Sequence, residues 1–283
     1  MKTLKQYAEE AQKKGIAVGH FNISNSEGFW AVALAAKELN VPVIIGVSEG
    51  ERDFIGVQQV AAMVKSYRES TDQPVFLNAD HTYSFDRVKE AIDAGYDAVI
   101  FDGTELSFED NAATTKKCVE YARSVNPQIL IEAEIGFIGK SSKLLDAVPE
   151  GVGRLTSVEE AKFFIDATGV DMLAPAVGNV HGMVKGGEPA LNIERINEIK
   201  NATGLPLVLH GASGNSVEDI QNAIKAGISI IHINTELRVA YRNGLMKSLQ
   251  ENPDEIAPYK YLKGARNAMQ RVVEEKLKLF NNL

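Results

Sequence analysis

LPLVLHGASGNSVEDIQNAIKAGISIIHI, residues 205–233, contains two short apolar runs joined by one amphipathic helical pattern. Ser216 stands where the helix N-cap belongs, with acidic residues close behind it, and Gly227 follows the last helical residue, where a left-handed cap is expected. Both runs are nearly continuous in apolar residues, which is typical of parallel strands buried on both faces. The stretch therefore predicts a strand, a helix and a second strand parallel to the first.

The same unit recurs along the whole chain. Eight such units in about 250 residues predict a (β/α)8 TIM barrel, and a doubly wound open sheet is the alternative. No linker or change of composition divides the chain, so we expect a single barrel domain over residues 1–283 with extra C-terminal helices from residues 254–280. The predicted strands are 16–21, 41–47, 74–79, 97–102, 128–134, 170–176, 205–210 and 228–233.

Composition excludes several classes of function. The net charge is −8 and the basic residues are dispersed, whereas nucleic-acid-binding proteins usually carry a basic patch, so we expect no nucleic-acid partner. The longest apolar runs fall well short of the roughly 20 residues of a membrane span. The charged N-terminus predicts no signal peptide, and the single Cys118 cannot form a disulfide within the chain. We therefore expect a cytoplasmic protein in a reducing compartment.

Histidines gather at the carboxyl ends of the predicted strands, where barrel enzymes carry their active sites. His81, His181 and His210 follow the third, sixth and seventh strands, and the chain has 5 histidines in total. Three imidazoles with one open position are typical of a catalytic zinc site. Of the other two, we expect His232 to be a packed or inward-facing structural residue. His20 faces the same rim as a candidate lining residue, but we do not expect it to be a ligand.

Asp80 lies directly before His81, where it could simply cap the next helix. Ser84 is better placed for that cap, so Asp80 is left free for chemistry.

Glycine-rich loops beside this rim favour a phosphate site. Barrel phosphate sites often use the loops after the seventh and eighth strands and a helix N-terminus. Small residues that merely allow tight turns are the alternative for either loop alone. The candidate residues are Gly178, Gly182 and Lys185 in one loop, Gly211, Ala212 and Ser213 in the next, and Asn234 and Thr235 at the last barrel helix.

Taken together, the motifs resemble class II fructose-bisphosphate aldolases. Agreement spans nearly the whole chain in order, and the close relatives of that family include tagatose-bisphosphate and 5-dehydro-2-deoxyphosphogluconate aldolases. The matching stretches are FNISNSEGFWAVALAAKELNVPVIIGVSEG (21–50), DH (80–81), EAEIG (132–136), GNVHG (178–182), LHGASG (209–214) and INTELR (233–238).

The resemblance implies a lyase that cleaves fructose 1,6-bisphosphate reversibly to dihydroxyacetone phosphate and an aldehyde. It implies Zn²⁺, or another divalent ion, on His81, His181 and His210, with Glu134 near the metal. Asp80 would move the proton of the hydroxyl at the cleaved bond. A monovalent cation, Na⁺ or K⁺, and a homodimer or homotetramer are also implied. The substrate contacts carried over are Asn22, Gly182, Lys185, Gly211, Ser213, Asn234 and Thr235.

Two departures from the family pattern leave the substrate open. The family usually has a Gly-Gly-x-Glu-Asp sequence in the loop after the fifth strand, but Lys140, Ser141 and Ser142 stand there, and Asp146 and Glu150 are the later candidates for the missing acid.

The family commonly grips the second phosphate with an arginine after a proline, where this chain has Pro258-Tyr259. The alternatives are therefore an aldolase for another ketose phosphate and a non-catalytic sugar-phosphate-binding paralogue. A metal-dependent barrel hydrolase is the competing enzyme class, although the first strand lacks its His-x-His pair.

Overall fold

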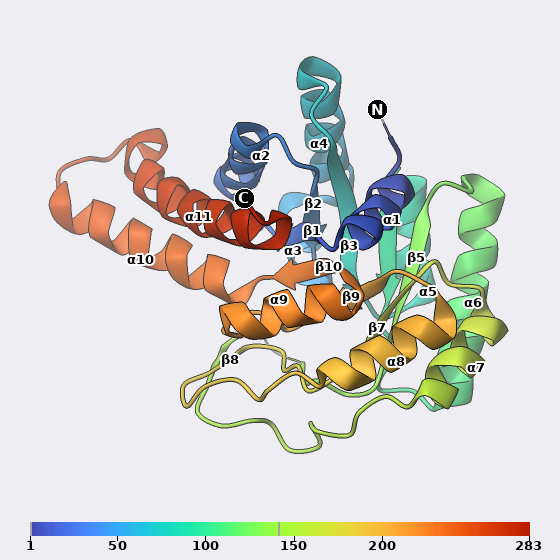
Figure 1. Ribbon diagram of the computed structural model, residues 1–283. Helices are drawn as coiled ribbons and strands as arrows, with labels where there is room; N and C mark the ends of the chain where they lie inside the picture. Colours follow the sequence, from blue (N-terminus) through green and yellow to red (C-terminus); the bar gives the residue numbers. More distant parts are fainter. Residues whose placement is uncertain (1, 141) are drawn as a thin grey trace.

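Eight parallel strands close into a barrel in the order β1-β10-β9-β7-β5-β4-β3-β2 (Figure 1). This computed structural model describes residues 2–140 and 142–283. The predicted (β/α)8 barrel is confirmed, and the open sheet is excluded. The barrel strands are β1 (Val18–Asn22), β2 (Val43–Val47), β3 (Val75–Thr82), β4 (Ala98–Phe101), β5 (Leu130–Ile135), β7 (Met172–Pro175), β9 (Leu207–Leu209) and β10 (Ile228–Ile233).

Each barrel strand is followed by at least one helix, and α11 is the extra C-terminal helix that the sequence predicts. Figure 1 shows α10 and α11 as an antiparallel pair, and α11 packs against α2. The helices are α1 (Leu4–Lys14), α2 (Ser26–Leu39), α3 (Glu49–Ile55), α4 (Val57–Thr71), α5 (Phe85–Asp93), α6 (Phe108–Val125), α7 (Val158–Thr168), α8 (Ile193–Thr203), α9 (Val217–Ala226), α10 (Thr235–Glu251) and α11 (Pro258–Asn281).

The helix ends follow the capping signals in the sequence. Ser84, Ser157 and Ser216 each accept a hydrogen bond from a backbone N–H in the first turn of the next helix. Within the described ranges, no helix is both long enough and apolar enough to cross a membrane.

Two long loops are tied together above the carboxyl end of the barrel. Short strands β6 (Leu144–Leu145) and β8 (Met183–Val184), which the sequence does not predict, pair in parallel. Met183 N–H donates to the Lys143 carbonyl at 2.9 Å, and Lys185 N–H donates to the Leu145 carbonyl at 2.9 Å. The loops after β5 and β7 therefore meet over the same end of the barrel.

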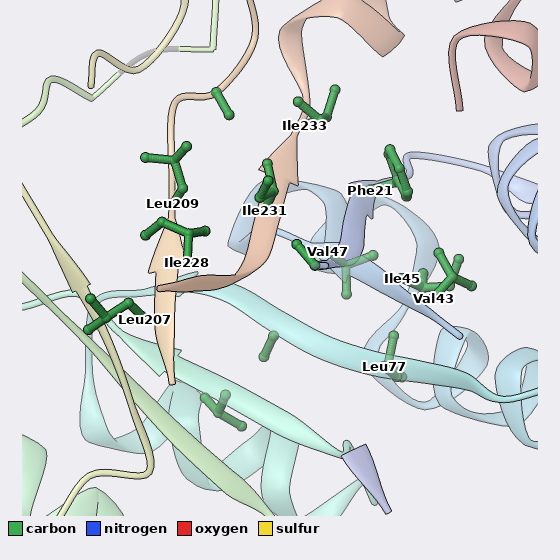
Figure 2. Packing of buried hydrophobic residues seen from close by; sticks show 14 of the residues in the cluster. Phe21, Val43, Ile45, Val47, Leu77, Leu207, Leu209, Ile228, Ile231 and Ile233 are labelled. Carbon is green, nitrogen blue, oxygen red and sulfur yellow. The ribbon is translucent and has the colours of Figure 1, made fainter. Parts of the chain in front are cut away.

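Successive strand residues point to opposite sides of the barrel wall, so each strand divides its side chains between the two. Phe21, Leu209 and Ile231 belong to the large apolar core that also takes in the surrounding helices (Figure 2). The inner set is apolar at the amino end, where α1 packs against it. This inner cluster contains Leu4, Ala8, Ala11, Val18, Ile44, Phe76, Ala98, Leu130, Met172, Ala174, Val208 and Ile230.

One step further along the strands, the same inward face becomes polar. His20, Asn78, Glu132 and His232 are all buried there. The side chains that could bind a ligand inside the barrel therefore lie at its carboxyl end.

A glycine in β2 makes room for this polar layer. A Cβ on Gly46 would lie 2.0 Å from the His20 ring, which is fully buried. We therefore expect Gly46→Ala to lower the free energy of unfolding by about 1–3 kcal/mol through overpacking.

Urea denaturation measures this change. Gly186→Ala is the matched control, since a Cβ there meets nothing within 4 Å, and it should leave the free energy of unfolding unchanged. Equal stability of the two variants would contradict the packing described here.

Candidate metal centre

Four potential ligands converge at the carboxyl end of the barrel. His81 of β3, Glu134 of β5, His181 of the loop after β7 and His210 after β9 each offer an atom, and these atoms all lie within 4.8 Å of one another. His81 Nε2 lies 3.3 Å from His210 Nδ1. Two nitrogens bound tetrahedrally to one zinc ion stand about 3.3 Å apart. The three imidazoles singled out in the sequence are therefore close enough to share one ion.

Each imidazole is fixed through its other nitrogen. His81 Nδ1–H donates to Asp102 Oδ2 at 2.9 Å. His181 Nδ1–H donates to the Gly139 carbonyl at 2.8 Å, and His210 Nε2–H donates to Glu132 Oε1 at 2.8 Å. Because carboxylates and carbonyls only accept, these bonds select the tautomer and leave one lone pair on each ring for a cation.

The charges of the cluster suit a divalent cation. Burial, together with the neighbouring imidazoles, lowers the pKa of His181 to about 3, and burial with His81 lowers the pKa of His210 to about 3. Burial also opposes the charged form of His81, but Asp80, Asp102 and Glu134 outweigh it and raise its pKa to about 10.

Glu134 Oε2 is buried without a hydrogen-bond partner among the described residues. A divalent ion would give that oxygen a partner and would replace the proton on His81 as the counter-charge. Three imidazole nitrogens are a donor set that zinc accepts, and with Glu134 beside them rather than bound they leave the fourth position open for a substrate oxygen.

Asp80 lies beside this cluster with one oxygen held and the other free. Asn22 Nδ2 donates to Asp80 Oδ2 at 2.8 Å. Oδ1 has no hydrogen-bond partner among the described residues and lies 3.5 Å from His232 Nδ1 and 3.9 Å from His81 Nε2. Burial raises the pKa of Asp80, but His81, His232 and His20 outweigh it and hold the pKa well below its usual value. Ser84 caps α5, so Asp80 does not serve as the helix cap.

A buried arginine fixes the backbone at this point. His81 has φ +40°, which is unusual for any residue other than glycine. Arg52 of α3 is fully buried and donates to the carbonyl of Val47 at 2.9 Å, to that of Asp80 at 3.4 Å and to Thr82 Oγ1 at 3.1 Å. It ties the end of β2 to the strained end of β3.

Three histidine rings form a stack beneath the site. The rings of His20 and His232 are parallel within 2° at 3.4 Å, and His210 lies 4.2 Å from His232 on the other side. Parallel rings at this spacing aim their lone pairs along parallel lines, so His20 and His232 cannot both bind one ion in their ring planes. His232 is buried and inward-facing and also lines the cavity described next, whereas His20 lies outside that lining.

A cavity of about 290 Å³ opens above the cluster. Lys185 lies outside its lining, exposed and paired with Asp146 at 2.6 Å. Glu134 also lies outside the lining, buried among the metal-site histidines. Gly178 and Ala212, which the sequence also suggested for the phosphate site, lie outside the lining as well. The sequence-predicted site residues that line the cavity are Asn22, Asp80, His81, His181, Gly182, His210, Gly211, Ser213, Asn234 and Thr235.

Close packing of two loops shapes the expected phosphate end. Gly211 has φ +59°, and a Cβ there would lie 2.3 Å from the Val180 carbonyl oxygen. Asn179 Nδ2 donates to the His210 carbonyl at 3.0 Å. The backbone after β9 therefore lies directly against the loop after β7. Thr235 begins α10, so the positive end of a helix dipole also faces the cavity.

The two departures seen in the sequence persist in the structure. Ser142 lines the cavity, whereas Asp146 and Glu150 are exposed and lie outside the lining. Ser141 falls outside the described residues. Tyr259, at the start of α11, is 69% exposed and is also absent from the lining.

Comparison with known proteins places the chain. The model of the family "Fructose-bisphosphate aldolase class-II" matches residues 2–283. The chain therefore belongs to the class II fructose-bisphosphate aldolase family, whose members are generally metal-dependent, and it is a lyase, so the resemblance seen in the sequence is confirmed.

Particular relatives agree with this assignment. Fructose-bisphosphate aldolase of Staphylococcus aureus is 40% identical over 281 residues, 98% of this chain and 96% of that protein. The probable fructose-bisphosphate aldolase of Bacillus subtilis is 40% identical over 275 residues, 96% of this chain and 94% of that protein. Among solved structures, the YdjI aldolase of Escherichia coli K12 superposes with a TM-score of 0.82 at 31% identity, covering 99% of this chain and 96% of that one.

His181→Ala should abolish stoichiometric zinc binding, because it removes one of the three imidazole ligands. Elemental analysis after zinc loading and desalting measures this. Lys185→Ala, at the exposed pair with Asp146, is the control and should keep full zinc content. Full zinc occupancy in the His181 variant would contradict the assignment of that ligand.

Asp102→Asn should weaken zinc affinity about 10–100-fold, the usual effect of losing an outer partner of a ligand. Asp102 Oδ1 accepts from Thr104 Oγ1 at 2.7 Å, so an asparagine that keeps this bond turns its NH₂ group toward His81 Nδ1. The ring would then hold its proton on Nε2, where the metal should bind. Competition with a zinc chelator measures the affinity, and an unchanged value would refute this role of Asp102.

Proposed function

We propose that this protein cleaves a ketose 1-phosphate reversibly to dihydroxyacetone phosphate and an aldehyde, with fructose 1,6-bisphosphate as the first substrate to test. The names of its relatives supply that substrate. One observation carries the proposal: three imidazoles and a carboxylate converge beside a second, ionised carboxylate that lines the same cavity. We propose zinc as the ion, with another divalent ion as the alternative.

The proposed chemistry divides between the ion and Asp80. A bound divalent cation would act as a Lewis acid that stabilises negative charge on the substrate oxygens. Asp80 Oδ1 accepts the proton of the hydroxyl at the cleaved bond, and that oxygen becomes the carbonyl of the aldehyde as the C–C bond breaks. The electron pair of the bond passes to the ketone half as an enediolate, whose carbon then takes up one proton to give dihydroxyacetone phosphate. Asn22 holds the other oxygen of Asp80 and so fixes the direction of the free one.

The phosphate of the dihydroxyacetone half is expected at the other side of the cavity. Gly182 and Gly211 offer backbone N–H groups with no side chain in the way, and Ser213 offers a hydroxyl. Asn234 and Thr235 add the start of α10. An associated Na⁺ or K⁺ ion, as the family resemblance implies, stays a prediction.

A different ketose phosphate is the second candidate. Tyr259 stands where the family commonly has the arginine that binds the second phosphate, and a tyrosine cannot replace that charge. Tyr259 also lies outside the cavity lining, which favours a substrate without a second phosphate. A non-catalytic sugar-phosphate-binding protein is the alternative to an enzyme. It is an alternative because Asp146 and Glu150, the candidates for the missing loop acid, both lie outside the cavity lining.

We propose a cytoplasmic homodimer or homotetramer, active in carbohydrate metabolism. The single cysteine, Cys118, is a buried free thiol, which suits a reducing compartment.

Asp80→Asn should lower kcat about 10²–10⁴-fold with unchanged zinc content, because the amide cannot take the hydroxyl proton. Release of dihydroxyacetone phosphate, followed with a coupled reductase, measures the rate. Asp86→Asn, an exposed acid in the first turn of α5, is the matched control and should keep the wild-type rate. A zinc-loaded wild type that cleaves no member of a ketose-phosphate panel would overturn the proposed function.

A further inference from the structure

Glu51 of α3 is a buried carboxylate that the proposed chemistry does not use, and it lies behind the lining of the main cavity. Its Oε2 accepts from Ser48 N at 2.8 Å, from Ser48 Oγ at 2.9 Å and from Asn22 Nδ2 at 2.9 Å. Its Oε1 accepts from Ser24 Oγ at 3.3 Å and from Arg238 at 2.7 Å. Both oxygens are therefore engaged, and Asn22 joins Glu51 directly to Asp80.

Arg238 of α10, the ion-pair partner of Glu51, is the residue of this pair that can contact a substrate. It lines the main cavity and also a neighbouring one of about 160 Å³, to which Glu51 and Asn22 contribute. Among the described residues, the lysines that line the main cavity are Lys140 and Lys143. Lys140 is paired with Glu105. Arg238 is the only arginine among these lining residues, so it alone offers the planar fork that suits a phosphate.

The pairing with Glu51 changes what Arg238 can bind. Glu51 accepts from only one nitrogen of Arg238, Nη2, so a second phosphate could bind the remaining donors of the guanidinium. That phosphate would then lie beside the carboxylate of Glu51, which is only 6% exposed, and the repulsion between the two would offset its attraction to Arg238. An uncharged hydroxyl can instead bond to the pair without breaking it.

Helix capping accounts for only part of this arrangement. Glu51 is the third residue of α3, so its bond to Ser48 N matches a capping box. That role uses Oε2 and leaves the ion pair of Oε1 with Arg238 unexplained. A glutamine caps equally well but carries no charge, which makes the two roles separable by experiment.

We propose that Glu51 determines specificity at the aldehyde end of the substrate. By neutralising Arg238, it makes the cavity favour ketose 1-phosphates that end in an uncharged hydroxyl over those that end in a second phosphate. The inference rests on the proposed function and narrows its substrate class.

The test compares fructose 1-phosphate with fructose 1,6-bisphosphate, which differ only at the far end. In the zinc-loaded wild type, the bisphosphate should have no advantage in kcat/KM. Glu51→Gln frees Arg238 and should shift the ratio toward the bisphosphate by about tenfold or more, the scale of one charge-assisted hydrogen bond. Adding Arg238→Met to Glu51→Gln should cancel that shift.

Glu49→Gln is the matched control. Glu49 lies on the same helix and lines the cavity, but it accepts from Tyr83 N at 2.9 Å and forms no ion pair with Arg238. Glu49→Gln removes one negative charge, as Glu51→Gln does, and should leave the ratio of kcat/KM for the two sugars close to that of the wild type. A wild type that prefers the bisphosphate by more than about tenfold, or a Glu51→Gln variant with the wild-type ratio, would overturn the proposal.

The ratio of kcat/KM for the two sugars in the wild type tests the role of Glu51 even if Glu51→Gln does not fold. Cleavage of either sugar upholds the proposed function whatever the ratio. If neither these two sugars nor any other ketose phosphate of the panel is cleaved, the proposed function fails. The ratio of the Kd values of the two sugars, measured by calorimetry, then replaces the ratio of kcat/KM as the test of the role of Glu51.

Discussion

The metal centre depends on the bonds that fix the far nitrogens of its three histidines. Asp102, the Gly139 carbonyl and Glu132 each accept from one ring. Asp102 directly follows β4, Gly139 lies in the loop after β5, and Glu132 lies within β5. Because an imidazole can rotate and change tautomer, the ligands alone do not define a site. If one of these acceptors moves, its histidine ring can rotate, and the lone pair of that ring then points away from the ion. The barrel keeps these acceptors in register, since β4 and β5 pair directly.

The barrel interior supports that register by dividing into two regions. Its amino half is filled with apolar side chains against α1, and its carboxyl half holds buried imidazoles and carboxylates. Burying so many titratable groups is costly unless they are paired or neutralised. Burial lowers the pKa values of the stacked rings of His20, His232 and His210, so these rings add no positive charge to this region. Burial also raises the pKa values of Glu132 and Glu134 well above their usual value, and a metal ion in the cluster would favour the charged forms of these groups.

The sequence predicted the barrel and the three converging histidines because both follow from local patterns. Apolar runs and helix caps give the strands and helices, and the barrel places every strand end on one rim. It did not predict α3, which is only seven residues long and lacks an amphipathic repeat. That helix carries Glu51 and Arg52, so the ion pair with Arg238 and the support of the His81 backbone were missed. Asp102 directly follows β4 and could have been found by the rule that identified the histidines.

The most direct measurement is an anomalous-diffraction crystal structure of the zinc-loaded protein. We expect one strong anomalous peak about 2.0–2.1 Å from His81 Nε2, His181 Nε2 and His210 Nδ1, with Asp80 beside it and unbound. A zinc ion bound instead between His20, Asp80 and His232 would contradict this expectation, and so would rings that turn away from a common centre.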